Sequence, residues 1–228
     1  ITSDSIIYGS IAGVIGILAI GSLYIALAIG PMGVMSPVSA ATSTVIPIII
    51  GIFIGENINS IGWLGIFLAI IAVIMVSFER REGGAKLSVS LKGLVIAISS
   101  GMFIGMFLSI VGLSSSESGI WTLVFARIVS TLIAFSYFFI TKDEDFKSTY
   151  KSNLIALILI SGVLDATANA LFVIATQSGY LTVTAVIASL FPAATVVLAT
   201  AFLKERLRVM QILGIILALM ASAILSTI

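Results

Sequence analysis

The sequence contains neither cysteine nor histidine. Without cysteine, the 228 residues offer no disulfide, thiolate nucleophile or thiolate metal ligand. Without histidine, they offer no imidazole base, proton relay or His-ligated metal. The motifs GxxxxGK[ST], GxGxxG and HExxH and a serine nucleophile elbow are also missing, so an ATP-driven pump or an intramembrane hydrolase has no support. We therefore expect no enzyme, no catalytic residue, no metal and no cofactor.

Charge is almost as scarce. Only 9% of the residues are charged and 60% are hydrophobic, whereas roughly 25% of the residues in a soluble domain are charged. A water-soluble fold of this size has too little interior to bury so much apolar surface. The composition therefore predicts a multi-pass membrane protein surrounded by lipid bilayer, and a net charge of +1 gives no reason to expect a nucleic-acid partner.

Long apolar runs fill most of the chain. A bilayer core of about 30 Å requires ~20 apolar residues in a helix. Glycine, serine and threonine are scattered through the runs, which suits helices that pack closely in lipid, and the short alternating segments of a β-barrel are missing. The sequence predicts an all-α integral membrane protein, a helical bundle of eight spans at residues 6–29, 32–54, 61–78, 91–112, 119–141, 153–176, 180–202 and 208–226.

The chain repeats itself at an offset of 149 residues. Residues 3–77 align with 152–226 without a gap, and 19 of the 75 positions are identical. The matches include two glutamates at helix exits, Glu56 and Glu205. Five predicted spans lie between residue 91 and the end. Because five is odd, two such units insert with opposite topology, as in the inverted repeats of many secondary transporters.

This repeat divides the chain into three parts. Residues 1–79 hold the last three spans of a first repeat, residues 80–90 form an inter-repeat loop, and residues 91–228 hold a complete second repeat of five spans. We expect the chain to be part of a ten-helix inverted-repeat (five plus five) fold, with two more helices ahead of residue 1. An unusual eight-span form is the alternative.

Several motifs resemble those of one transporter family. Residues 188–226 carry a proline in the predicted ninth helix, an acidic residue followed by Arg-Leu at its exit, and a glycine in the tenth helix. The first repeat has a degenerate copy, and the run WTLVFARIVSTLIAF has an arginine entering the seventh helix. In residues 188–226 these are Pro192, Glu205, Arg206, Leu207 and Gly214. The degenerate copy keeps Glu56 and Gly65, and the arginine of the seventh helix is Arg127. In these features the chain resembles the EamA-type carriers of the drug/metabolite transporter superfamily, as helices three to ten.

The resemblance implies a secondary transporter that works by alternating access and exports or exchanges a small metabolite. Members of the superfamily carry amino acids, drugs, sugars or nucleotide sugars, so an amino acid is one candidate substrate. The resemblance also implies a multi-pass protein of the bacterial cytoplasmic membrane, and it leaves a homodimer open. It does not identify the substrate.

One carboxylate lies deep in a predicted span. Asp165 is about 13 residues into its helix, near the bilayer centre, where a charge costs several kcal/mol unless it is paired or hydrated. Asn169, four residues later, shares its helix face. Arg127 lies on a neighbouring span, at a depth that differs by roughly 6 Å, and is the expected partner. We predict that the three side chains bind substrate or a proton. A purely structural salt bridge is the alternative.

Other candidates lie at helix breaks and exits. In the span 32–54, serines accompany two prolines, which remove backbone donors and can open carbonyl groups to a cavity. Ordinary kinks and close packing are the alternative. The acidic residues at helix exits are either functional or solvated helix ends. The candidates are Ser36, Ser39 and Ser43 for substrate binding, Pro37, Pro47 and Pro192 for helix breaks or gating, and Glu56 and Glu205 as acidic exits.

The sequence leaves open two rival functions and the orientation of the protein in the membrane. The rivals are a membrane scaffold that transports nothing and a flippase for lipid-linked substrates with a lateral opening. Ten of the eleven lysines and arginines cluster on one side of the predicted bundle, which makes that side cytoplasmic. The family resemblance implies the reverse orientation.

Overall fold

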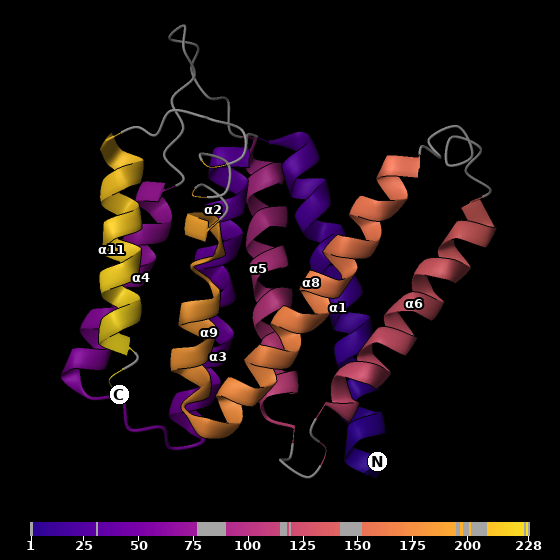
Figure 1. Cartoon of the computed structure of the whole chain (residues 1–228), viewed down its shortest axis with the longest axis horizontal. Helices are drawn as coiled ribbons and strands as arrows, with labels where there is room; N and C mark the ends of the chain where they lie inside the picture. Colours follow the sequence, from indigo (N-terminus) through magenta and orange to yellow (C-terminus); the bar gives the residue numbers. More distant parts are fainter. Residues whose placement is uncertain are drawn as a thin grey trace, which may run out of the picture.

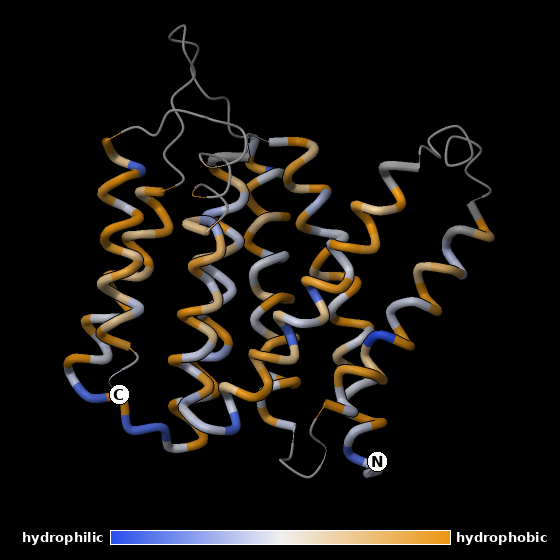
Figure 2. Tube along the Cα trace, in the orientation of Figure 1, coloured by the Kyte–Doolittle hydropathy of each residue, from blue (hydrophilic) through white to orange (hydrophobic). Residues whose placement is uncertain are grey.

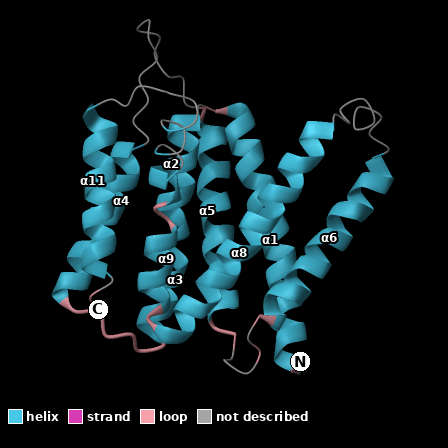
Figure 3. Cartoon of the chain, viewed as in Figure 1, coloured by secondary structure: helices cyan, strands magenta, loops and turns pink. Residues whose placement is uncertain are grey.

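The computed structural model describes residues 2–30, 32–76, 90–114, 118, 120–141, 152–194, 197, 201, 209–225 and 227. Every regular element in this part of the chain is a helix (Figure 3). In chain order the helices are α1 (Ser3–Ile29), α2 (Met32–Ser43), α3 (Val45–Phe53), α4 (Ser60–Val76), α5 (Leu91–Gly112), α6 (Trp121–Thr141), α8 (Ser152–Ser178), α9 (Leu181–Ala188) and α11 (Val209–Leu225) (Figure 1).

Several of these helices are long and apolar enough to cross a membrane. Within the described residues four meet both criteria, at 3–29, 34–53, 91–112 and 155–178, and four shorter apolar helices accompany them. Each of the eight predicted stretches contains one of these helices. Large hydrophobic side chains are exposed along them, and Figure 2 shows that hydrophobic residues recur along every helix. An all-helical bundle with an apolar exterior is a multi-pass integral membrane protein.

Two predicted spans are interrupted near prolines. The span 32–54 consists of two helices, α2 and α3, that meet at Thr44. Pro47 has no N–H to donate to the carbonyl group of Ser43, four residues earlier, which accounts for a break at this point. In the next-to-last span α9 ends at Ala188, and Pro192 lies in a separate helical turn.

Small residues allow the helices around α5 to approach closely. A Cβ atom built on Gly105 of α5 would lie 2.5 Å from the carbonyl oxygen of Ser43. The Ser39 hydroxyl donates a 2.9 Å hydrogen bond to the Ala97 carbonyl oxygen. On the other side of α5, the Ser100 hydroxyl reaches the Ala19 carbonyl oxygen at 3.1 Å. Helix association in lipid depends on such close backbone contacts because apolar burial supplies little driving force there.

Helices α4 and α11 run antiparallel, and their contacts are reciprocal. A Cβ atom on Gly65 of α4 would lie 2.9 Å from the side chain of Leu225 at the end of α11. The counterpart of Gly65 at the 149-residue offset is Gly214, whose Cβ atom would lie 2.6 Å from the backbone nitrogen of Val76. Val76 is the counterpart of Leu225. Contacts that exchange in this way are typical of a two-fold relationship between the two elements.

Helix ends follow the same offset. Helices α1 and α8 each contain 27 residues, and α4 and α11 each contain 17. Both ends of α8 lie 149 positions after those of α1, and both ends of α11 lie 149 positions after those of α4. The offset of 149 residues therefore relates the bounds of these two pairs of helices.

Helices α6 and α8 lean away from the other helices over part of their length (Figure 1). In α8 every residue from 155 to 168 is exposed, whereas Phe172 and Val173 are buried. In α6 the described side chains between 131 and 140 are exposed as well. Over these exposed segments the two helices therefore enclose a space beside α1 and α5, although Ala126 of α6 and Val173 of α8 belong to the buried core.

Candidate functional site

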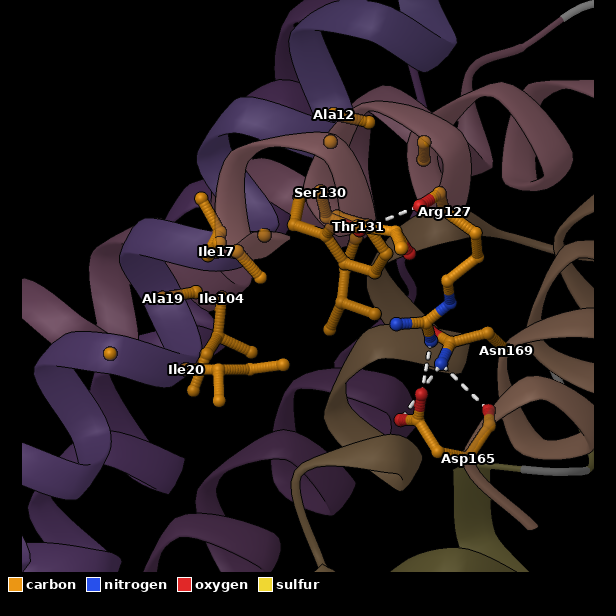
Figure 4. A pocket seen from close by; sticks show the side chains of 17 residues that line it. Ala12, Ile17, Ala19, Ile20, Ile104, Arg127, Ser130, Thr131, Asp165 and Asn169 are labelled. Atoms are coloured by element: carbon orange, nitrogen blue, oxygen red, sulfur yellow. Dashed lines mark hydrogen bonds and ion pairs between the residues drawn. The ribbon is translucent and has the colours of Figure 1, made fainter. Parts of the chain in front are cut away.

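A cavity of about 530 Å³ lies between α1, α5, α6 and α8. Its volume falls within the range of small-molecule pockets, about 300–1,000 Å³. Figure 4 shows the side chains that line it. The lining residues are Ala12, Gly13, Gly16, Ile17, Ala19, Ile20, Gly21, Ile104, Phe107, Leu108, Ala126, Arg127, Ser130, Thr131, Ala134, Asp165 and Asn169.

The polar wall of the cavity contains one ion pair, an amide and the hydroxyl residues Ser130 and Thr131. The guanidinium of Arg127 on α6 donates to the carboxylate of Asp165 on α8 (Figure 4). The Asn169 amide donates to the Asp165 carboxylate at 3.2 Å and to its main-chain oxygen at 2.8 Å. The side chains of Arg127 and Asp165 are 40% and 52% exposed, respectively. Both charges therefore face the open space of the cavity, where a bound molecule can reach them.

The opposite wall is apolar. It is formed by α1 and α5, with Ile17, Ile20, Ile104 and Phe107 among its side chains. Gly21 adds open space, because a Cβ atom built there would meet nothing within 4 Å. A ligand in this cavity therefore meets charges on the side of α6 and α8, and hydrocarbon on the side of α1 and α5.

The structure brings three predicted site residues together and leaves the serines elsewhere. Asp165, Asn169 and Arg127 meet in the cavity wall. Ser39 is buried against α5 and Ser43 donates within its own helix to the Ala40 carbonyl oxygen at 2.8 Å. Ser36 is half-buried, and none of the three serines lines the cavity. A binding role for these serines stays a prediction.

Pro37, Pro47, Pro192 and Glu56 are not among the residues that line the cavity. Pro37 is buried inside α2, and Pro47 and Pro192 are buried beside helix breaks. Glu56 accepts hydrogen bonds from the first backbone N–H groups of α9. Glu205 lies outside the described residues, as do the basic loops except for Lys92.

The apolar wall contains residues that the sequence did not single out. Gly16 and Ile20 of α1 both line the cavity. They are the repeat counterparts of Asp165 and Asn169, which line it from α8. The 149-residue alignment was therefore the signal that could have identified them, because it pairs them with Asp165 and Asn169.

The apolar bundle and its cavity, which is apolar except on the side of α6 and α8, define an α-helical integral membrane protein with room for a small molecule between its helices. The comparison with protein families identifies it further. The model of the EamA-like transporter family matches residues 91–227, which is more than half of the chain. The chain belongs to this family of membrane transporters. No curated protein matched it in a sequence search.

Proposed function

We propose that the protein is a secondary transporter that carries a small organic metabolite through the cavity by alternating access. The observation that carries this proposal is the half-exposed Arg127–Asp165 ion pair in the wall of an otherwise apolar cavity. Charged groups within membrane helices are expensive and typically mark substrate or ion pathways. A purely structural salt bridge buried between helices would need neither a cavity nor exposed partners.

The chemistry of the wall favours an amino acid as the substrate. Arg127 and Asp165 neutralise each other, so a ligand with a single charge would leave one of them uncompensated in a low-dielectric site. A zwitterion compensates both, with its carboxylate on Arg127 and its ammonium group on Asp165. The isoleucines and Phe107 on the opposite wall suit an apolar side chain. An α-amino acid with a hydrocarbon side chain meets all of these conditions.

The proposed transporter is built as an inverted repeat of five plus five helices. Residues 1–79 would belong to the first repeat and residues 91–228 would form the second, joined by the loop 80–90. The matching ends of two helix pairs and the reciprocal contacts between α4 and α11 support this arrangement. We place the protein in the bacterial cytoplasmic membrane, with all eight predicted spans crossing the bilayer.

Counterflow of labelled amino acids into proteoliposomes tests the proposed function. Uptake should be saturable, and the variants Arg127→Gln and Asp165→Asn should reduce it strongly at equal protein content. Asp4→Asn is the matched control, because Asp4 is an exposed acid on α1 outside the cavity lining. Unchanged counterflow in both cavity variants would contradict the proposal.

The same variants separate the rival functions. A scaffold with a structural ion pair would lose folded yield in the variants without having any counterflow to lose. A flippase would move labelled lipid across the vesicle membrane and leave amino acids outside. Either pattern would replace the transporter proposal.

A further inference from the structure

Helix α8 is anchored to the bundle near one end only. Its exposed residues run from 155 to 168, and its buried residues Phe172 and Val173 lie in the last two turns. Asp165 belongs to the exposed part. The direction in which α8 leaves the bundle therefore decides whether this carboxylate meets Arg127.

The direction of α8 is set at its junction with α9, where Gly179 and Tyr180 connect the two helices. The first N–H groups of a helix have no partner within it. Tyr180 is the N-cap of α9, and its side chain makes no capping hydrogen bond. The Glu56 carboxylate caps the helix instead. It accepts from the Leu181 nitrogen at 2.5 Å and from the Thr182 nitrogen at 3.1 Å.

Local structure aims Glu56 at this junction. Gly55 has a φ of 86°, in the left-handed region that favours glycine. The Glu56 nitrogen donates to the Gly51 carbonyl oxygen at 2.9 Å and the Gly55 nitrogen donates to the Ile52 carbonyl oxygen at 3.1 Å. This pair of bonds is a Schellman motif that ends α3. It fixes the backbone from which the Glu56 side chain reaches α9.

The gap that the carboxylate occupies is narrow. A Cβ atom built on Gly51 would collide with the Glu56 carboxylate and with the Thr182 hydroxyl. Thr182 also donates to the Pro47 carbonyl oxygen at 3.4 Å. The ends of α3 and α9 therefore meet around one carboxylate, which a shorter side chain cannot replace.

We propose that Glu56 is a positioning residue for the cavity. By holding the first turn of α9, it fixes the junction from which α8 extends and so keeps Asp165 beside Arg127. The inference rests on the proposed function for its effect on transport, but its effect on α8 can be measured independently. From Ser178 back to Leu157 the helical rise amounts to about 32 Å, so a tilt of 5° at the junction moves Leu157 by roughly 3 Å.

Pulsed electron spin distances measure this movement. The sequence has no cysteine, so two introduced cysteines are the only thiol labelling sites in it. Labels at Leu157 of α8 and Val95 of α5, both exposed, report the direction of α8. Labels at Val95 and Ile74 of α4, also exposed, form a reference pair without α8.

Three variants decide the result. In Glu56→Ala and Glu56→Gln the 157–95 distance should shift or broaden by several ångströms, because neither side chain can accept from both N–H groups as a carboxylate does. Asn59→Ala is the matched control. It removes the cap of α4, in which Asn59 Oδ1 accepts from the Gly62 nitrogen at 2.8 Å, and it should leave both distances unchanged. Glu56→Gln keeps the side-chain shape and decides alone if the alanine variant does not fold.

Counterflow of L-leucine completes the test. We expect about a tenfold loss in Glu56→Gln when α8 moves. An unchanged 157–95 distance in the Glu56 variants would overturn the inference, even if counterflow fell. A shifted distance in a protein that shows no counterflow at all would support the positioning role of Glu56 and reject the proposed transport function instead.

Discussion

Removing the charge of Asp165 while keeping the shape of its side chain is the most direct perturbation of the cavity. Asp165→Asn leaves Arg127 without its partner in the wall. An arginine at the centre of a membrane helix costs about 2.5–3.5 kcal/mol on insertion scales, whereas an exposed ion pair in water contributes ~0.2–1 kcal/mol. The pair lies between membrane helices and lines a cavity, so we take a value between these limits. We therefore assign about 1–2 kcal/mol to the interaction.

If Asp165 also holds the substrate ammonium group, the same free energy appears in binding. A loss of about 1–2 kcal/mol corresponds to a roughly 5–30-fold change in an equilibrium constant. The KM for L-leucine counterflow should rise by that factor in Asp165→Asn. A double-mutant cycle with Arg127→Gln should give a coupling of the same size, because the two residues are in direct contact.

Proteoliposomes supply the KM, and thermal unfolding in detergent supplies the stability of the same preparations. Asp4→Asn controls for the loss of an acidic residue as such. A KM within twofold of the parent protein, together with additive single variants, would refute a shared role of the pair in binding. Reduced stability with unchanged KM would assign the ion pair to structure alone.

Three further variants test other parts of the structure. Gly21→Leu places a side chain in open cavity space, so counterflow of L-phenylalanine should fall by about tenfold or more while that of L-alanine persists. Gly214→Leu forces a side chain against the Val76 backbone, where a Cβ atom would already lie at 2.6 Å. This overpacking should cost about 1–3 kcal/mol of stability and lower the melting temperature. The control Gly21→Ala should leave the melting temperature unchanged. Ser39→Ala removes the hydrogen bond to the Ala97 carbonyl oxygen and should cost about 0.5–1.5 kcal/mol of stability with unchanged counterflow; a raised KM would place Ser39 in the substrate path.

The sequence predicted those features whose free energy depends mainly on one type of residue. Long apolar runs predict membrane helices because the bilayer requires every backbone group to be bonded within a helix. Asp165 stood out because a charge in such a run must find a partner, and Arg127 on α6 is in contact with it. Both conclusions depend on large local free energies that no distant contact can reverse.

Contacts between residues far apart in the chain could not be predicted from the sequence pattern. The serines of the span 32–54 share a polar pattern with cavity residues, but Ser39 turns toward α5, where its hydroxyl meets a carbonyl group. Glu56 at a helix exit gave no indication that its carboxylate caps a helix that begins 125 residues later. Such partners follow from the crossing of helices, which the periodicity of a single helix does not encode.

In the proposed arrangement, a difference between the two repeats at one pair of positions would account for the polar and the apolar wall of the cavity. In the proposed two-fold arrangement Asp165 and Gly16 occupy equivalent positions, and both line the cavity. A second carboxylate at position 16 would place two like charges around the same space, and among the described residues Arg127 is the one arginine that lines it. Glycine instead leaves room beside Phe107, whose ring would lie 3.2 Å from an added Cβ atom. In the proposed arrangement this difference would give the site distinct ends, which suits the proposed zwitterion with a hydrocarbon side chain.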